Sequence, residues 1–255
     1  MASISDYLEL ELLDHVFDTG AYTPPTIYVA LGTGASDAAL TGEPSGNGYA
    51  RKAHSSWNTA ASRAIDNNGV ITFDAATGSW GTMTHYALYD AATVGNMLGW
   101  GVLNTGKAIV DGNTPSIADT EIAISISSGG FSTVLANELL DHVLGNGVYT
   151  APTIYVGLST ANPTDDASGN AEPSNNYARK DHAAWDAAAA GATENTGVIT
   201  FATPSGTWGL ITYATIWDAV SAGNMLLYST ATPNQTPEAD DTVQFADGAM
   251  DITLD

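Results

Sequence analysis

The chain has 255 residues, of which 44% are apolar and 13% are charged, and 28 acidic against 6 basic residues give it a net charge of −22. Because such an acidic field repels phosphate backbones, we expect no nucleic-acid binding. The absence of cysteine excludes disulfides and thiolate metal sites. The sequence shows no secretory leader and no apolar run of membrane-spanning length, so we expect a soluble protein made in the cytoplasm, with no membrane contact.

The sequence consists of two similar halves. Tyr22-Thr-Pro-Pro-Thr-Ile-Tyr-Val-Ala-Leu31 returns half a chain length later as Tyr149-Thr-Ala-Pro-Thr-Ile-Tyr-Val-Gly-Leu158. Matching segments continue on both sides of these stretches, and two copies are too few for a solenoid. A tandem duplication therefore predicts two similar domains, 1–127 and 128–255, each near the usual domain size.

Each half opens with an apolar stripe at helical spacing. Ser3 with Asp6 resembles a capping box for the first helix, and Gly20 and Gly145 are the predicted helix stops. We expect these helices to pack on their own sheets or to dock onto neighbouring subunits. The stripe residues that are candidates for such an interface are Leu8, Leu12, Val16, Leu135, Leu139 and Val143.

Beyond each helix the pattern is one of strands and turns, interrupted by the polar loop Gly32–Gly48. The strands predicted in the first half are Thr26–Leu31, Tyr49–Lys52, Val70–Phe73, Thr82–Asp90, Met97–Leu103 and Glu121–Ile126. Short strands with frequent turn signals predict a mainly β fold of two antiparallel β-sandwich or barrel domains, each with one N-terminal α-helix. The predicted linker is Ser127–Phe131.

The few basic residues are concentrated at one repeated position. Four of the six lie in the Arg-Lys dipeptides that begin at Arg51 and Arg179, and a carboxylate, Glu43 or Glu172, precedes each of them. One interpretation makes each arginine an anion clamp. The other, which we favour, makes it half of a buried ion pair that locks the polar loop to its strand, because arginine binds carboxylates with two parallel hydrogen bonds.

Four tryptophans occupy equivalent positions in the two halves: Trp57, Trp80, Trp185 and Trp208. Exposed aromatic rings could stack on sugars, which would make the chain a carbohydrate-binding adhesion module. We favour buried anchors in the β cores. The exposure of Trp80 and Trp208 separates these two interpretations. No two histidines have the spacing of a helical metal site, and we expect all five to be structural.

The polar loop of the second half contains enough oxygen ligands for Ca²⁺ to be considered. Asp165 and Asp166 begin the segment Asp165–Glu172 of this loop, but the segment lacks the spacing of an EF-hand, and the first half offers only Asp37 there. We expect a solvated loop, without a bound metal or other cofactor. The sequence also lacks a nucleophile elbow and a phosphate-binding loop, so we expect no enzymatic activity.

A helix is followed in the first half by an ordered series of motifs: Thr-Ile-Tyr-Val-Ala-Leu, Glu-Pro-Ser, Tyr-Ala-Arg, Gly-Val-Ile-Thr-Phe, Gly-Ser-Trp-Gly, Thr-His-Tyr-Ala-Leu-Tyr-Asp-Ala and Gly-Asn-Met-Leu. This order resembles a family of small tailed-phage structural proteins that are labelled tail-fibre or head proteins. The resemblance covers both halves and implies a virion component built on a β-sandwich and made in the host cytoplasm, with no catalytic residues. The fusion of two copies departs from the family's usual single domain.

The resemblance leads to a specific expectation, a non-enzymatic virion protein that decorates or cements the capsid exterior. The expected partners are the major capsid protein or other virion proteins. Self-association is also expected, with a trimer as one arrangement that would present six similar domains. The alternative is a tail, baseplate or tail-fibre component. Long fibres show heptads or repetitive shafts, and the sequence has neither, which favours the head.

Overall fold

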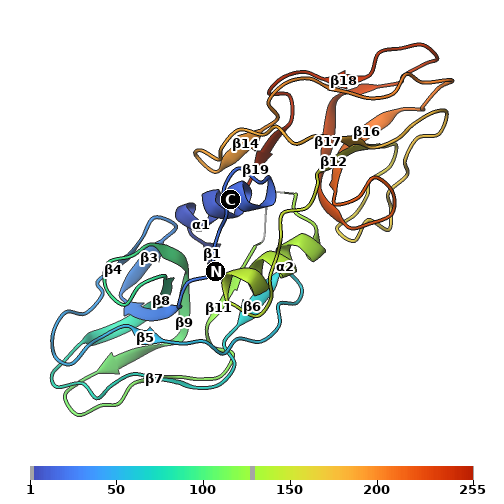
Figure 1. Ribbon diagram of the computed structural model, residues 1–255. Coiled ribbons are helices and arrows are strands. Elements are labelled where there is room, and N and C mark those ends of the chain that lie inside the picture. The colour runs from blue at the N-terminus through green and yellow to red at the C-terminus, as the bar shows by residue number, and fades with distance from the viewer. Residues whose placement is uncertain (1–2, 127–129, 255) are drawn as a thin grey trace. The chain divides into compact units, whose positions relative to one another are not determined.

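The protein is described by a computed structural model, which covers residues 3–126 and 130–254 (Figure 1). Contacts divide the chain into two compact units. Unit 1 consists of Met1–Glu9, Thr23–Ser127 and Asn137–Tyr149, and unit 2 consists of Leu10–Tyr22, Ser128–Ala136 and Thr150–Asp255. The sheets of each unit therefore come from one half of the sequence, whereas the helical segments of each unit come from both halves. Most of the predicted linker lies outside the described residues.

The main sheet of unit 1 has five strands in the order β1-β9-β8-β2-β5, and each neighbouring pair is antiparallel. Its strands are β1 (Ser3–Ile4), β2 (Tyr28–Gly32), β5 (Lys52–Ala53), β8 (Gly81–Tyr89) and β9 (Met97–Ile109). Three smaller antiparallel pairs complete the unit: β3 (Gly34–Ser36) with β4 (Ala39–Thr41), β6 (Ala64–Asp66) with β11 (Ala123–Ser125), and β7 (Ile71–Thr72) with β10 (Ser116–Ile117).

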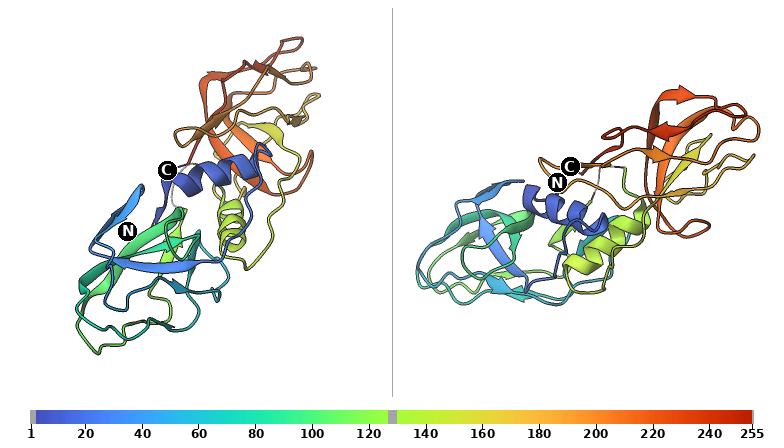
Figure 2. Two further views of the ribbon diagram at one scale, coloured as in Figure 1. Left: turned by 60° about the vertical axis from the view of Figure 1, so that its left-hand side comes forward. Right: turned by 45° about the horizontal axis from the view of Figure 1, so that its top comes forward.

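The main sheet of unit 2 has four strands in the order β13-β12-β16-β17. Figure 2 shows the ribbon from two further directions. The four strands are β12 (Tyr155–Ser159), β13 (Lys180–Asp181), β16 (Ile211–Trp217) and β17 (Met225–Gln235). Two smaller pairs accompany them: β14 (Ala192–Glu194) with β19 (Asp251–Thr253), and β15 (Ile199–Thr200) with β18 (Gln244–Phe245).

The prediction of a mainly β fold with one N-terminal helix in each repeat is confirmed, and no sheet of the described residues closes into a barrel. Successive side chains of an extended segment point to opposite faces, so every second one enters the core, as the fully buried Ile122 and Ile124 do. Two segments differ from their predictions. Of the predicted strand Tyr49–Lys52, only Lys52 lies in a strand, β5. The loop Gly32–Gly48 contains the β3–β4 hairpin, because Thr33 N–H bonds the Thr41 carbonyl at 2.9 Å and closes it.

The two helices are α1 (Asp6–Val16) and α2 (Thr133–Val143). Ser5 caps α1, since its hydroxyl accepts the Leu8 N–H at 3.2 Å, and Ser132 caps α2 by accepting the Leu135 N–H at 3.1 Å. The predicted cap at Ser3 was wrong because Ser3 belongs to β1, where it pairs with β9. Neither helix, within the described part of the chain, has the length and apolarity needed to cross a membrane.

The helix ends follow a common geometry. After α2, Gly145 has a positive φ of 78°, a conformation that glycine adopts without steric cost. The residue in that conformation after α1 is Asp18, with φ 56°, so the predicted stop at Gly20 lies two residues too late. The Asp14 carbonyl accepts the Thr19 N–H at 2.9 Å and the Gly20 N–H at 3.1 Å, which satisfies the end of the helix.

The last turns of the helices make equivalent contacts in the two units. In unit 2 the Asp14 carboxylate accepts the backbone N–H of Ala188 at 2.7 Å. In unit 1 the Asp141 carboxylate accepts the backbone N–H of Ala60 at 2.8 Å. Each unit thus holds the end of a helix from the other half of the sequence through a charge-assisted hydrogen bond.

Candidate functional site

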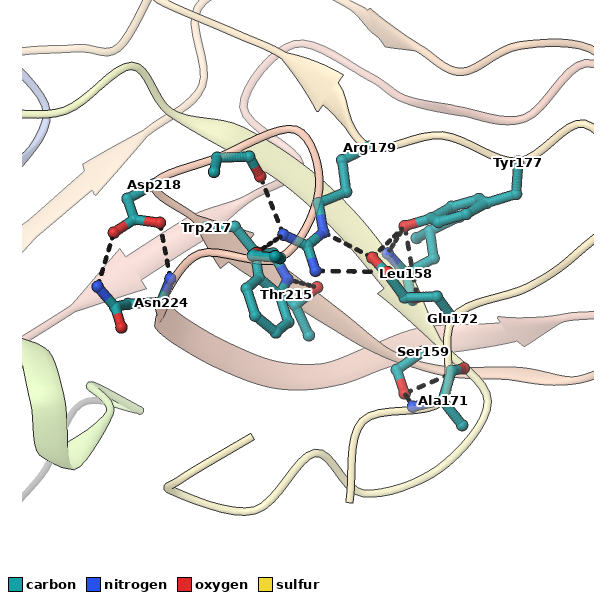
Figure 3. A network of polar contacts seen from close by, with 12 residues as sticks. Leu158, Ser159, Ala171, Glu172, Tyr177, Arg179, Thr215, Trp217, Asp218 and Asn224 are labelled. Carbon is teal, nitrogen blue, oxygen red and sulfur yellow. Dashed lines mark hydrogen bonds and ion pairs between the residues drawn. The ribbon is translucent and has the colours of Figure 1, made fainter. Parts of the chain in front are cut away.

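The repeated Arg–Glu pair lies at the centre of a polar network in each unit, and Figure 3 shows the copy in unit 2. Arg179 directly precedes β13 and its side chain is only 4% exposed. Its Nε donates to Glu172 Oε1 at 2.7 Å and its Nη2 donates to Glu172 Oε2 at 3.3 Å. The two groups therefore form a bidentate ion pair, the geometry that the planar guanidinium favours.

The remaining donors of Arg179 bind the turn between β16 and β17. Its Nη1 donates to the carbonyl of Ala219 at 2.9 Å and to that of Ala222 at 2.7 Å. Asp218 shapes this turn, because its carboxylate accepts both the backbone N–H and the side-chain amide of Asn224, at 2.7 and 2.9 Å (Figure 3). The arginine thus ties the loop that carries Glu172 to a turn more than 40 residues further along the chain.

Aromatic side chains enclose the ion pair. The guanidinium carbon of Arg179 lies 3.5 Å from the centre of the Trp217 ring, in a cation–π contact. The Tyr177 hydroxyl accepts the Leu158 N–H at 2.7 Å and donates to Glu172 Oε1 at 3.4 Å. The pair is therefore bound to β12 as well as to the β16–β17 turn.

Unit 1 repeats this network with one exchanged ring. Arg51 Nε and Nη2 donate to the two Glu43 oxygens at 2.8 and 2.9 Å, and Nη1 donates to the Ala91 and Val94 carbonyls at 3.1 and 2.6 Å. Its guanidinium carbon lies 3.4 Å from the centre of the Tyr89 ring, in the position of Trp217. The Arg51 side chain is 9% exposed and the Glu43 side chain is 25% exposed.

The network changes the acidity of its members. Burial raises the pKa of the Tyr49 hydroxyl far above its ordinary value, and the negative charge of Glu43 raises it further. Burial of Arg51 acts to lower its pKa, but the hydrogen bond and charge of Glu43 outweigh this and raise it. Tyr177, like Tyr49, has a strongly raised pKa because it is buried. Tyr49 and Tyr177 therefore stay neutral donors, and Arg51 stays charged, at any ordinary pH.

These contacts form an internal ion-pair network, here called the latch. It consists of Arg51, Glu43, Tyr49 and Tyr89 in unit 1 and of Arg179, Glu172, Tyr177 and Trp217 in unit 2. Each guanidinium uses four hydrogen bonds on groups of its own unit, and its ring partner covers one face. Little donor capacity is left for a phosphate or a carboxylate from outside. The contacts of Arg51 and Arg179 thus fit an internal ion pair far better than an anion clamp.

The four repeated tryptophans lie in the interior, with exposures of 3% to 7%. The indole N–H of Trp80 donates to the Asn47 carbonyl at 2.8 Å, and that of Trp208 donates to the Asn175 carbonyl at 3.0 Å. Tyr49 packs edge-on against Trp80, and Tyr177 does so against Trp208. Rings buried in this way offer no face on which a sugar could stack.

The acidic loop of unit 2 is held by hydrogen bonds to protein groups. Asp165 accepts the Tyr228 hydroxyl at 2.9 Å, and Asp166 accepts the Thr164 hydroxyl at 2.7 Å and the Ser168 N–H at 3.0 Å. Hydrogen bonds from the Ser168 side chain, the Thr164 hydroxyl and the Ser168 N–H lower the pKa of Asp166 to about 2. No group of three potential metal ligands occurs in the described residues.

The helix residues considered as an interface lie in the cores. Leu8, Leu12 and Val16 of α1 have no exposed surface, and neither do the three from α2, Leu135, Leu139 and Val143. Their burial follows from the apolar stripe, which packs inside the units. A side chain without exposed surface cannot contact a neighbouring molecule, so a docking surface must consist of other residues.

Sequence reasoning missed several members of the latch. Tyr49 and Tyr177 stand two residues before the arginines in the repeated Tyr-Ala-Arg motif, and this spacing could have identified them. The ring under the guanidinium could not be identified, because Tyr89 in one repeat is Trp217 in the other. The carbonyls that accept from Nη1 carry no sequence signal, since they belong to the backbone.

Comparison with known proteins identifies the repeated domain. The family described as Podophage GP4 fiber I protein gp80 matches residues 3–125 and, separately, residues 130–253. No curated protein matches the chain. The two matched regions cover almost the whole sequence and coincide with the two halves. The chain therefore belongs to the podophage GP4 fiber I protein gp80 family of phage structural proteins, whose domain it carries twice in tandem.

Proposed function

We propose that the chain is a non-enzymatic fibre component on the exterior of a podophage virion. The observation that carries this proposal is the match of both repeats to a family whose description names a fibre protein. The polar networks support it, because their donors and acceptors are used within the units and serve to fix loops and turns. The expected partners are other virion proteins, with synthesis in the host cytoplasm before assembly.

The net charge of −22 supports a position outside the shell. Packaged DNA repels an acidic surface, whereas a strongly charged exterior protein stays soluble while many copies assemble close together. We propose self-association as part of this role, with a trimer as the arrangement to test. Light scattering of the purified chain measures its mass directly, and a monomer at virion-like local concentration would contradict this part of the proposal.

Decoration of the capsid is the second candidate, and the short helices favour it. Each of the two helices has 11 residues, and the described residues contain no coiled-coil segment that would form a long shaft. The chain would then bind the major capsid protein instead of the tail. Compact domains can also form the adaptor or tip of a fibre, so the family match keeps the fibre role first.

Immunogold electron microscopy on intact virions separates the two roles. Antibodies against the full chain should label the fibres around the tail. Label spread evenly over the head would establish decoration in its place. Virions without label that nevertheless contain the chain would place it in the interior, and this would contradict both candidates.

A further inference from the structure

The two repeats differ in how one part of their core is filled. Unit 2 contains a cavity of about 680 Å³ that is lined by β16, β17, β18 and β19. Cavities of this size are typical of small-molecule sites. Its wall is mixed, with apolar groups such as Phe245 and Ile252 and polar groups such as Ser229 and Gln244.

Three positions explain the cavity. Where unit 1 has Tyr86, Leu103 and Glu121, the equivalent residues that line the cavity are Ala214, Ala231 and Ala249. Strand pairing supports the alignment, because Tyr86 is opposite Gly101 and Ala214 is opposite Ser229. Ile122 N–H donates to Asn67 Oδ1 and Met250 N–H donates to Asn195 Oδ1, both at 2.8 Å, and these equivalent bonds fix the register of the last strands.

The surrounding core shows the consequence. In unit 1 the side chains of Ile117, Ile122 and Ile124 have no exposed surface. Their equivalents in unit 2 are more open: Met250 and Ile252 are each 8% exposed, and Phe245 is half-buried. Apolar surface that one repeat removes from water is thus accessible in the other, which is unfavourable unless something covers it.

The Tyr86 side chain shows what chemistry fits the space. Its hydroxyl donates to the Ala123 carbonyl at 2.6 Å and accepts the Ala123 N–H at 2.9 Å. The residue equivalent to Ala123 is Asp251, which lines the cavity. The Tyr86 hydroxyl makes two hydrogen bonds to the Ala123 backbone. Among the described residues, no side chain makes the equivalent two hydrogen bonds to the Asp251 backbone.

We propose that the cavity in unit 2 binds a small neutral molecule with an aromatic ring and a hydroxyl group. The ring takes the space that the Tyr86 ring takes in unit 1, against Ile216, Phe245 and Ile252. The hydroxyl bonds the backbone N–H and carbonyl of Asp251. A neutral ligand suits a chain of net charge −22 better than an anion.

The test titrates p-cresol, which is the side chain of tyrosine without its backbone, into the full chain, with binding followed by calorimetry and saturation-transfer NMR. We expect saturable binding to one site. Toluene lacks the hydroxyl and should bind about tenfold more weakly, the equivalent of one net hydrogen bond. Ala214→Tyr fills the space covalently and should abolish binding, whereas Ala183→Tyr, at an exposed position outside the cavity, should leave it unchanged.

Absence of saturable p-cresol binding would overturn the proposal, and so would binding that Ala214→Tyr leaves unchanged. Circular dichroism establishes that each variant is folded. If Ala214→Tyr does not fold, Ala231→Leu replaces it, because it restores the Leu103 side chain of unit 1 and should weaken binding in the same assay.

Discussion

Arg179 lies over the ring of Trp217, with its guanidinium carbon 3.5 Å from the ring centre. Unit 1 keeps this arrangement with a different ring, since Arg51 lies 3.4 Å above Tyr89. The two rings differ in size and in polar group, but both present an aromatic face to the cation. The feature common to the repeats is therefore a desolvated arginine enclosed by a carboxylate, two carbonyls and an aromatic face. We therefore expect removal of this arginine to lower the free energy of unfolding.

Replacement of Arg179 by alanine should lower the free energy of unfolding by about 3 kcal/mol, because it leaves Glu172 and two partly buried carbonyls without their partner. Arg179→Lys should recover less than half of this loss, since an ammonium cannot bond both carboxylate oxygens in the same plane. Urea denaturation measures both values. Lys180→Ala is the matched control, with a side chain 46% exposed and an expected change below about 0.5 kcal/mol. An Arg179→Ala effect as small as that of the control would show that the latch contributes nothing.

The turn that receives Arg51 depends on Gly95, which has a φ of 70°. A Cβ atom there would lie 2.7 Å from the Ala91 side chain and would also meet the Asp90 carboxylate. Gly95→Ala should therefore cost more stability than the roughly 1 kcal/mol that an alanine at positive φ costs by itself. Gly112→Ala is the control, because Gly112 has a similar φ of 79° and open space around its Cβ position. Equal thermal shifts in the two variants would exclude the steric part of this explanation.

The buried tyrosines predict a loss of stability at alkaline pH. The pKa values of Tyr49, Tyr177, Tyr86 and Tyr89 are all raised by burial, so the folded protein holds these hydroxyls neutral. The unfolded chain ionises them near pH 10, and the stability they contribute is complete below that pH and decreases as the pH rises above it. Absorbance at 295 nm should show a group of tyrosines that ionises only on unfolding. A titration in which all 11 tyrosines of the folded chain ionise near pH 10 would contradict the burial.

The helix contacts predict that the two halves stay together after cleavage between them. Ala188 bonds Asp14 in unit 2, and Ala60 bonds Asp141 in unit 1, so each unit needs both halves of the sequence. A protease site inserted after Ser127 should give two fragments that elute as one species in size-exclusion chromatography. The double variant Asp14→Ala and Asp141→Ala should dissociate at lower urea concentration, whereas Asp74→Ala, with a side chain 72% exposed, should not. Two independent folded fragments in native buffer would support separate domains that divide at residue 127.

Much of the fold could be predicted because local patterns and tertiary contacts agree. The alternation in Glu121–Ile126 predicted the strand, and the core buries Ile122, Ile124 and Ile126 as that alternation requires. The helix cap was misplaced because Ser3 and Ser5 are both good caps locally, and only the pairing of Ser3 with Trp100 decides between them. The partners of Asp14 and Asp141 could not be predicted, since hydrogen bonds to backbone N–H groups leave no mark on the partner's residue type.

The candidate sites, like the fold, could be predicted only in part from the sequence. Scarcity of basic residues drew attention to Arg51 and Arg179, and repetition of the preceding carboxylate suggested the partner. The cavity in unit 2 could not be predicted from the sequence, because no single residue signals it. It becomes visible only when Ala214, Ala231 and Ala249 are compared with the larger residues at the same positions in unit 1.

Quantification of the chain in fractionated virions tests the central claim most directly. Purified particles are disrupted, DNA-filled heads are separated from tails with their fibres, and mass spectrometry measures the chain in each fraction against the major capsid protein and a tail protein. The fibre role predicts that the chain is recovered with the tails and fibres in a fixed ratio to the tail protein. Recovery with the heads alone would contradict the fibre role in favour of decoration, and absence from both fractions would contradict a place in the virion.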